Sequence, residues 1–237
     1  MLMRNLTALP SEQRSVMLDG RQITYTLKRS QRRSIGLRID DLGLTVSMPL
    51  KASERWLHEV LQQRAGWVID KLEDWQAHAP EKPTWKDGEI IHYLGEILTL
   101  RIGSFPKTVQ QVGEALCVKD EGSASHIEKR VSTWYRKQAL PLFISRAEHY
   151  AKILDVRPCS IRLTTARTRW GSCSSSGEVR LNVQLIKLPH YLIDYVIVHE
   201  LAHLREMNHS AAFWKLVESA CPDYARLRSE LKAVILC

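Results

Sequence analysis

The chain has 237 residues, of which 44% are hydrophobic and 25% are charged, an ordinary composition for a folded protein with one large domain or two small ones. It contains no apolar run of about eighteen residues, and residues 1–10 lack the apolar core of a signal peptide. We therefore expect a cytoplasmic protein without a membrane partner. The formal net charge of +8 indicates affinity for an anionic partner without identifying it.

The cysteines argue against a secreted protein built on disulfides. Their number is odd and no Cys-x-x-Cys pair occurs. We expect reduced and mostly buried thiols at Cys117, Cys159, Cys173, Cys221 and Cys237.

Residues 1–76 are expected to form a first domain that begins with a small sheet. Apolar residues recur with a period of two from Gln22 to Pro49, interrupted by a hairpin turn at residues 40–43, which predicts antiparallel strands. Residues 28–33 read Lys-Arg-Ser-Gln-Arg-Arg. This basic run is either a solvated turn between strands or a contact for nucleic acid or phosphate.

A long helix follows the sheet. Ser53 is placed to cap it, and apolar residues keep helical spacing as far as Leu72. We expect Trp56 and Trp67 on this helix to belong to the core.

A linker and a second β-rich region come next. Residues 77–85 contain two prolines and form the first candidate domain boundary. Residues 86–120 contain four short segments with strand patterns, which we expect to extend the β-rich N-terminal part.

Residues 121–237 form the last expected domain. Ser125 and Glu128 have the spacing of a capping box at the start of a long helix, which Pro141 should kink or split. Strands are predicted at residues 160–166 and 178–183.

The most informative stretch is His199-Glu200-Leu201-Ala202-His203. Residues four apart share one face of a helix and are separated by a rise of about 6 Å, so His199 and His203 can bind one metal ion. Glu200 is turned to the side, from where its carboxylate can act as a general base on a water at the metal. The pattern predicts a catalytic Zn²⁺ site.

Catalytic zinc has three protein ligands, and His209 is the best candidate for the third. On a straight helix it would lie about 9 Å beyond His203 on another face, so the helix has to end and the chain has to fold back. Asn208 tolerates the left-handed conformation that ends helices. Glu218 on a later helix is the rival ligand.

The loop before the second of these strands reads Arg167-Thr168-Arg169-Trp170-Gly171-Ser172-Cys173-Ser174. It either supplies an edge for an extended substrate and arginines for an anionic group, or serves only in packing and turn formation.

Several motifs in this order resemble the YgjP-like metallopeptidase family, which is related to the SprT-like proteases among the zincins. They are Arg169–Ser174, Leu181-Asn182, Ile193–Val196, His199–Leu204, Asn208–Ser210 and Phe213-Trp214. The resemblance implies an α+β fold with a zincin-like C-terminal domain that carries the HExxH helix, preceded by a small β-rich region with one long helix. It also implies that His199, His203 and His209 bind Zn²⁺, with Glu200 as catalytic acid and base. The candidate substrate-binding residues are Arg167, Arg169, Trp170 and Asn182.

The histidine spacing also equals that of metzincins, but Glu206 occupies the position of their turn glycine and no methionine follows Met207. We therefore reject that class. The leading function is a zinc metallopeptidase acting on a protein or peptide. The alternatives are a metal-dependent pyrophosphatase acting on nucleoside triphosphates, an activity also ascribed to the family, and a DNA-associated SprT-like protease or nucleic-acid-binding protein.

Overall fold

The computed structural model describes residues 11–40, 42–78, 83–234 and 236. Its contacts divide the chain into two compact units, Met1–Glu81 and Lys82–Cys237. The short strands of residues 86–120 therefore share a unit with the His199–His203 stretch. Residues 79–82 of the expected linker and residue 41 of the expected hairpin turn lie outside the described residues.

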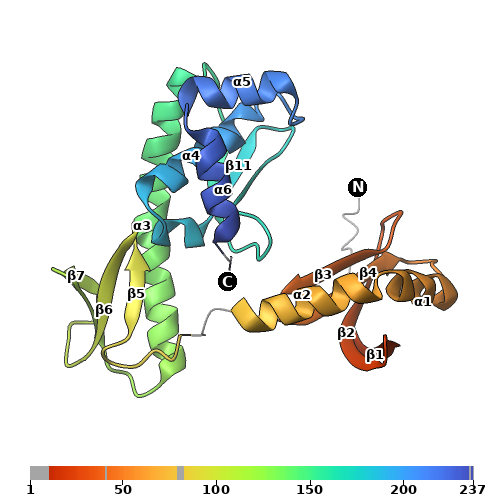
Figure 1. The fold of residues 1–237 in the computed structure, drawn as a ribbon. Helices are drawn as coiled ribbons and strands as arrows, with labels where there is room; N and C mark the ends of the chain where they lie inside the picture. Colours follow the sequence, from red (N-terminus) through yellow and green to blue (C-terminus); the bar gives the residue numbers. More distant parts are fainter. Residues whose placement is uncertain (1–10, 41, 79–82, 235, 237) are drawn as a thin grey trace, which may run out of the picture. The chain divides into compact units, whose positions relative to one another are not determined.

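The described residues of the first unit form one sheet and two helices (Figure 1). Its elements are β1 (Glu12–Leu18), β2 (Arg21–Ser30), β3 (Gly36–Asp40), β4 (Gly43–Pro49), α1 (Glu54–Gln63) and α2 (Ala65–His78). The strand order is β1-β2-β4-β3, and β2 pairs with β4 in parallel while the other pairs are antiparallel. The prediction of a purely antiparallel sheet was wrong, because β4 returns between β2 and β3. β1 was not predicted, since only its last residue, Leu18, is fully buried.

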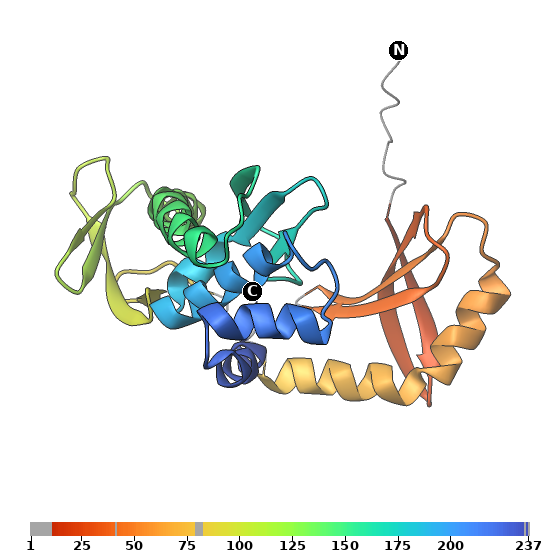
Figure 2. The same cartoon turned by 90° about the horizontal axis from the view of Figure 1, so that it is seen from above.

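The helical part of this unit differs from the prediction in two ways. Ser53 caps α1 as expected, accepting a hydrogen bond from the Trp56 N–H at 3.2 Å, but Arg64 ends that helix and a second one follows (Figure 2). The side chains of Trp56 and Trp67 are 37% and 42% exposed, so their assignment to the core was wrong. The buried positions belong to the neighbouring leucines and valine instead, because a helix face turned by one residue points about 100° away.

The basic run of residues 28–33 is partly used within the unit. Arg29 donates to the Ala52 carbonyl at 3.1 Å and pairs with Glu54 at 2.6 Å. The Arg32 guanidinium lies against Gly36, where an added Cβ would be 2.6 Å from it. These contacts hold the end of β2 in place, and a contact with nucleic acid stays a prediction.

The second unit is built around one long helix. Its elements are β5 (Ile90–Tyr93), β6 (Glu96–Gly103), β7 (Gln110–Val112), β8 (Ala115–Lys119), α3 (Ala124–Ile153), β9 (Ser160–Thr164), β10 (Gly171–Cys173), β11 (Glu178–Asn182), the 3-10 helix η1 (Val183–Lys187), α4 (His190–Ala202), α5 (Ala211–Ala220) and α6 (Tyr224–Ala233). Figure 2, with α3 nearly end-on, shows sheet β5–β8 on one side of it and the strands β9–β11 with α4 on the other. Buried side chains from both sides form a single core with α3.

The start and course of α3 correct two predictions. Its N-cap is Ser123, whose hydroxyl accepts from the His126 N–H at 3.4 Å, and not Ser125. The helix continues without interruption through the exposed Pro141 for 30 residues. Pro141 has no backbone N–H and so loses one helical hydrogen bond. Buried side chains on either side of it, including Trp134 and Phe143, offset this loss.

Sheet β5–β8 has the order β5-β6-β8-β7 and does not extend the sheet of the first unit, contrary to expectation. Its hairpin turn at Leu94 and Gly95 has positive φ at both residues. The N–H groups of this turn donate to the carbonyls of Ile186 and Lys187 at 2.8 and 3.1 Å. The turn thereby holds η1, which leads directly into α4.

The described cysteines are free, but they are less buried than expected. Cys117, Cys173 and Cys221 are half-buried and Cys159 is exposed, while Cys237 lies outside the described residues. None of the described helices combines the length and apolar character needed to cross a membrane.

Candidate metal centre

The helix α4 carries the first part of the site. Residues Leu192 to Ala202 are almost all buried, because α4 lies between α3 and the sheet β9–β11. Asp194 fastens it to α3 by accepting two hydrogen bonds from the Arg146 guanidinium, both of 2.7 Å. His199 and Glu200 are thus held on a rigid, buried element.

Three histidines converge where α4 ends. One ring nitrogen from each of His199, His203 and His209 lies within 4.8 Å of the others, and Nε2 of His209 is 3.0 Å from Nε2 of His199. The chain folds back after His203, and Ser210 caps α5 by accepting from the Phe213 N–H. The helix ends well before Asn208, which is not among the described residues with positive φ, so the expected left-handed role was wrong.

The donor set suits a divalent metal of the zinc type. Burial, reinforced by the neighbouring histidines, lowers the pKa of His199 to about 3, and burial also lowers the pKa of His203. Both rings are therefore neutral at pH 7 and have a lone pair to offer. The His203 Nδ1 lies 3.0 Å from the Glu206 carbonyl oxygen, and donation through Nδ1 leaves Nε2 free for a metal. Nδ1 of His199 is buried without a hydrogen-bond partner among the described residues.

An aromatic floor supports the histidines. The ring of the fully buried Phe213 lies with its centroid 4.6 to 5.0 Å from those of all three. Trp214 stacks on His209 at 5.7 Å and on Tyr224 at 5.2 Å. Phe213 thus packs against all three rings, whereas His209 is the exposed member of the group.

Glu200 lies beside the histidines against the edge strand β10. Its side chain is buried, and burial raises its pKa to about 7, with the charge of Arg169 acting in the opposite direction. An added Cβ at Gly171 would lie 2.6 Å from both Oε1 and Cγ of Glu200. Burial and the same carboxylate also raise the pKa of the Cys173 thiol.

The candidate substrate residues take different positions. Arg167 and Arg169 are exposed and Trp170 is half-buried against the core. Asn182 is 1% exposed, and its amide donates to the carbonyls of Ala166 at 2.6 Å and Arg169 at 3.0 Å. Asn182 therefore holds the loop that carries the other three.

The rival ligand Glu218 is exposed on α5 and does not belong to the histidine group. Three contributions to the site were not predicted from the sequence. They are the close approach of Gly171 to Glu200, the carbonyl of Glu206 and the floor formed by Phe213. Gly171 stands in a stretch that was interpreted as a loop, so neither the strand β10 nor its close approach to Glu200 was predicted. The other two depend on the fold of the turn after α4.

Three imidazoles next to a buried carboxylate are the arrangement of a metal-dependent hydrolase. The family model described as YgjP-like, metallopeptidase domain, matches residues 33–234. The chain therefore belongs to the YgjP-like family, which confirms the resemblance of its motifs.

Similar proteins were found among curated sequences and solved structures. UTP pyrophosphatase from Escherichia coli (strain K12) is 25% identical over 130 residues, which are 52% of this chain and 78% of that protein. The metallopeptidase zymogen abylysin of Pyrococcus abyssi is 24% identical, with 38% of this chain and 95% of abylysin covered and a TM-score of 0.34. The zymogen jannalysin of Methanocaldococcus jannaschii is 20% identical, with 39% and 97% covered and the same TM-score of 0.34.

Proposed function

We propose that this protein is a zinc metallopeptidase of the zincin type, with His199, His203 and His209 as metal ligands and Glu200 as general base. The observation that carries the proposal is the convergence of the three ring nitrogens within 4.8 Å, next to a buried carboxylate. Family membership supports the same class of enzyme.

The choice of zinc follows from the ligand chemistry. Imidazole nitrogens suit Zn²⁺, whereas Mg²⁺ and Ca²⁺ prefer oxygen ligands. With these three protein ligands a bound zinc would keep one position for a water or substrate, and His209 is the exposed member of the three. A bound Zn²⁺ supplies positive charge that acidifies a water and polarises a carbonyl group.

The remaining steps belong to the chain itself. Glu200 accepts the proton of the attacking water and delivers it to the leaving amine. Its position against Gly171 keeps the carboxylate from swinging towards β10. β10 lies at the edge of its sheet, in the order β10-β11-β9, so its free side offers backbone groups to an extended peptide. Asn182 positions the loop that carries Arg167, Arg169 and Trp170.

The proposal is tested by measuring metal content and hydrolysis together. Purified wild type, Glu200→Gln and His209→Ala are analysed by mass spectrometry for metals and assayed on a casein-type substrate. We expect near-stoichiometric zinc in the first two, reduced zinc in the third and hydrolysis only in the wild type. A wild type without zinc, or full casein hydrolysis by Glu200→Gln, contradicts the proposal.

A second candidate function is hydrolysis of a nucleoside triphosphate to its monophosphate. It is favoured by the similarity to the protein named UTP pyrophosphatase and by the exposed Arg169 beside Glu200. Arginine binds phosphate oxygens through paired hydrogen bonds. Pyrophosphate release from UTP is measured in wild type and Glu200→Gln. Release by the wild type alone, without casein hydrolysis, would favour this function, whereas equal release by both proteins would exclude it.

A further inference from the structure

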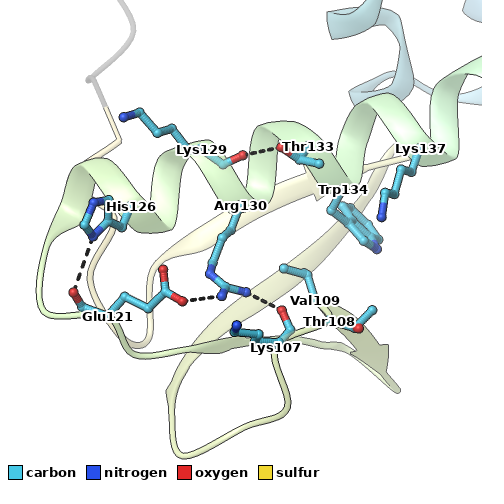
Figure 3. Close-up of a pocket in the computed structure, with 10 residues that line it drawn as sticks. All are labelled: Lys107, Thr108, Val109, Glu121, His126, Lys129, Arg130, Thr133, Trp134 and Lys137. Atoms are coloured by element: carbon cyan, nitrogen blue, oxygen red, sulfur yellow. Dashed lines mark hydrogen bonds and ion pairs between the residues drawn. The ribbon is translucent and has the colours of Figure 1, made fainter.

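A hollow of about 360 Å³ lies between the N-terminal half of α3 and the segment that joins β6 to β7 (Figure 3). It shares no residue with the three histidines. Figure 1 shows sheet β5–β8 beside the first half of α3 and α4 to α6 gathered beside its second half. The hollow is therefore a feature of the opposite end of this unit from the metal centre.

The walls of the hollow are strongly basic. They carry the cationic side chains of Lys107, Lys129, Arg130 and Lys137 and the single carboxylate of Glu121, which makes a net charge of +3 with His126 neutral. Lys129 and Lys137 both lie on α3, and in Figure 3 Lys137 points down beside Trp134 whereas Lys129 points away from the hollow. Lys107 approaches from the loop before β7 (Figure 3).

The Glu121 carboxylate already has a partner within the wall of the hollow. Arg130 donates to the Glu121 carboxylate and to the Lys107 carbonyl oxygen. The hydrogen bond from Arg130 lowers the pKa of Glu121, which is thus ionised and balances the charge of that arginine. Among the described residues, no carboxylate lies within 4.0 Å of the ammonium groups of the three lysines. In Figure 3 the Lys129 side chain points away from the hollow, so the charges left for a ligand are those of Lys107 and Lys137.

We propose that this hollow binds the oligophosphate group of a small phosphorylated molecule. The uncompensated ammonium groups of Lys107 and Lys137 beside a concave surface attract a compact polyanion. Lysine binds phosphate as a point charge. The hydrogen bond from Arg130 to the Lys107 carbonyl oxygen holds the backbone of Lys107 in position. The volume lies within the range of about 300 to 1,000 Å³ that small-ligand sites occupy.

The uncharged groups of the wall fit the same ligand. The Thr133 hydroxyl donates to the Lys129 carbonyl at 2.7 Å, so its oxygen can still accept a hydrogen bond. Trp134 forms a rigid wall, because its ring packs against Tyr93 at 4.8 Å and Tyr135 at 5.2 Å. Only 6% of this tryptophan is exposed. Proteins that bind single-stranded nucleic acid commonly stack bases on exposed aromatic rings, whereas the tryptophan of this hollow is buried, which favours the small ligand.

A neighbouring hollow of about 500 Å³ shares Thr133 and Lys137 with the first. Its walls add Arg136 and Arg162 and the apolar side chains of Leu140, Ile161 and Leu163. Arg162 lies 3.9 Å from the Glu178 carboxylate, whereas Lys107 and Lys137 have no acidic partner among the described residues. We therefore place the phosphates in the first hollow.

The proposal is independent of the peptidase activity and is tested by calorimetric titration of tripolyphosphate into the full chain without added metal. The pocket variant is Lys107→Gln/Lys137→Gln, and the control is Lys152→Gln/Lys232→Gln, which removes the same charge from exposed positions elsewhere in this unit. We expect binding to weaken at least about tenfold, or about 1.4 kcal/mol, in the pocket variant, and to be retained by the control and by His209→Ala.

Three results would overturn the proposal. Equal affinity of wild type and the pocket variant would show that the lysines do not bind the anion. Loss of binding in His209→Ala alone would place the phosphate at the metal centre. A single-stranded oligonucleotide that binds more tightly than tripolyphosphate, with the same dependence on both lysines, would assign the hollow to nucleic acid.

Discussion

Gly171 of the edge strand β10 touches the side chain of Glu200 so closely that a Cβ at Gly171 would lie 2.6 Å from Oε1 and Cγ and 2.8 Å from Cδ. Contacts under 3.0 Å do not occur between such atoms, so a side chain at residue 171 requires the carboxylate or the strand to move. The backbone of one element therefore determines where the proposed general base can lie.

The first prediction concerns Gly171→Ala. We expect hydrolysis to fall by about a hundredfold, because a displacement of about 1 Å at a catalytic group has that effect, while zinc content stays unchanged. Activity and metal content measured on one preparation check this. Gly66→Ala is the matched control, since a Cβ there meets no atom within 4 Å. Wild-type activity in Gly171→Ala would show that the contact does not constrain Glu200.

The second prediction concerns the loop that Asn182 holds. Replacing Asn182 by alanine leaves the carbonyls of Ala166 and Arg169 without their donor. An unsatisfied buried polar group costs about 1 to 3 kcal/mol, and we expect that loss in the free energy of unfolding. Asn182→Asp should be less stable still at pH 8, because a carboxylate would face two carbonyl oxygens. Denaturant titrations measure both, and equal stability of the three proteins would contradict this assignment.

The third prediction concerns the pH dependence of the metal-free protein. The folded-state pKa of Glu200 is raised from 4.5 to about 7 by burial. The folded state thus binds more protons than the unfolded state between these values, and stability falls as pH rises through this window. Glu200→Gln removes the free-energy cost of ionising a buried carboxyl group.

The difference in unfolding free energy between Glu200→Gln and wild type should therefore grow in favour of the variant from pH 4 to pH 8. The upper limit is about 3 kcal/mol, at about 1.4 kcal/mol for each pKa unit. Unfolding curves of both proteins in a metal chelator at the two pH values provide the measurement. A difference that does not change with pH would show that Glu200 is not desolvated.

The fourth prediction concerns the link between α3 and α4. Arg146→Lys keeps the charge but loses the paired hydrogen bonds to Asp194, both of 2.7 Å. We expect unfolding free energy to fall by about 1 to 3 kcal/mol, as for other charged hydrogen bonds that are removed. Arg226→Lys is the control, because its pair with Glu230 is exposed and such pairs contribute at most about 1 kcal/mol. Equal losses in the two variants would mean that the Asp194 contact is unimportant.

Local spacing was sufficient to predict the elements that carry the site. The offset between His199 and His203 indicated a shared helix face, and Ser53 was recognised as a cap because capping depends on the next three residues alone. The strand patterns at 160–166 and 178–183 were also confirmed within a few residues. These features depend on interactions between residues close in sequence.

Tertiary packing determined the features that the spacing of residues in the sequence could not predict. The exposure of Trp56 and Trp67 depends on which face of their helices meets the sheet, and the uninterrupted course of α3 through Pro141 depends on buried contacts on both sides.

The sequence by itself determined the family to which the motifs belong, and it indicated the three imidazoles and the carboxylate of the metal site that we propose. Only the tertiary structure decided that Gly171 contacts the Glu200 side chain and that Asn182 holds the loop by hydrogen bonds. It also placed lysines from two segments at one hollow. The physical reason is that these contacts join residues far apart in the chain, and their geometry follows from how helices and sheets pack and not from any local pattern.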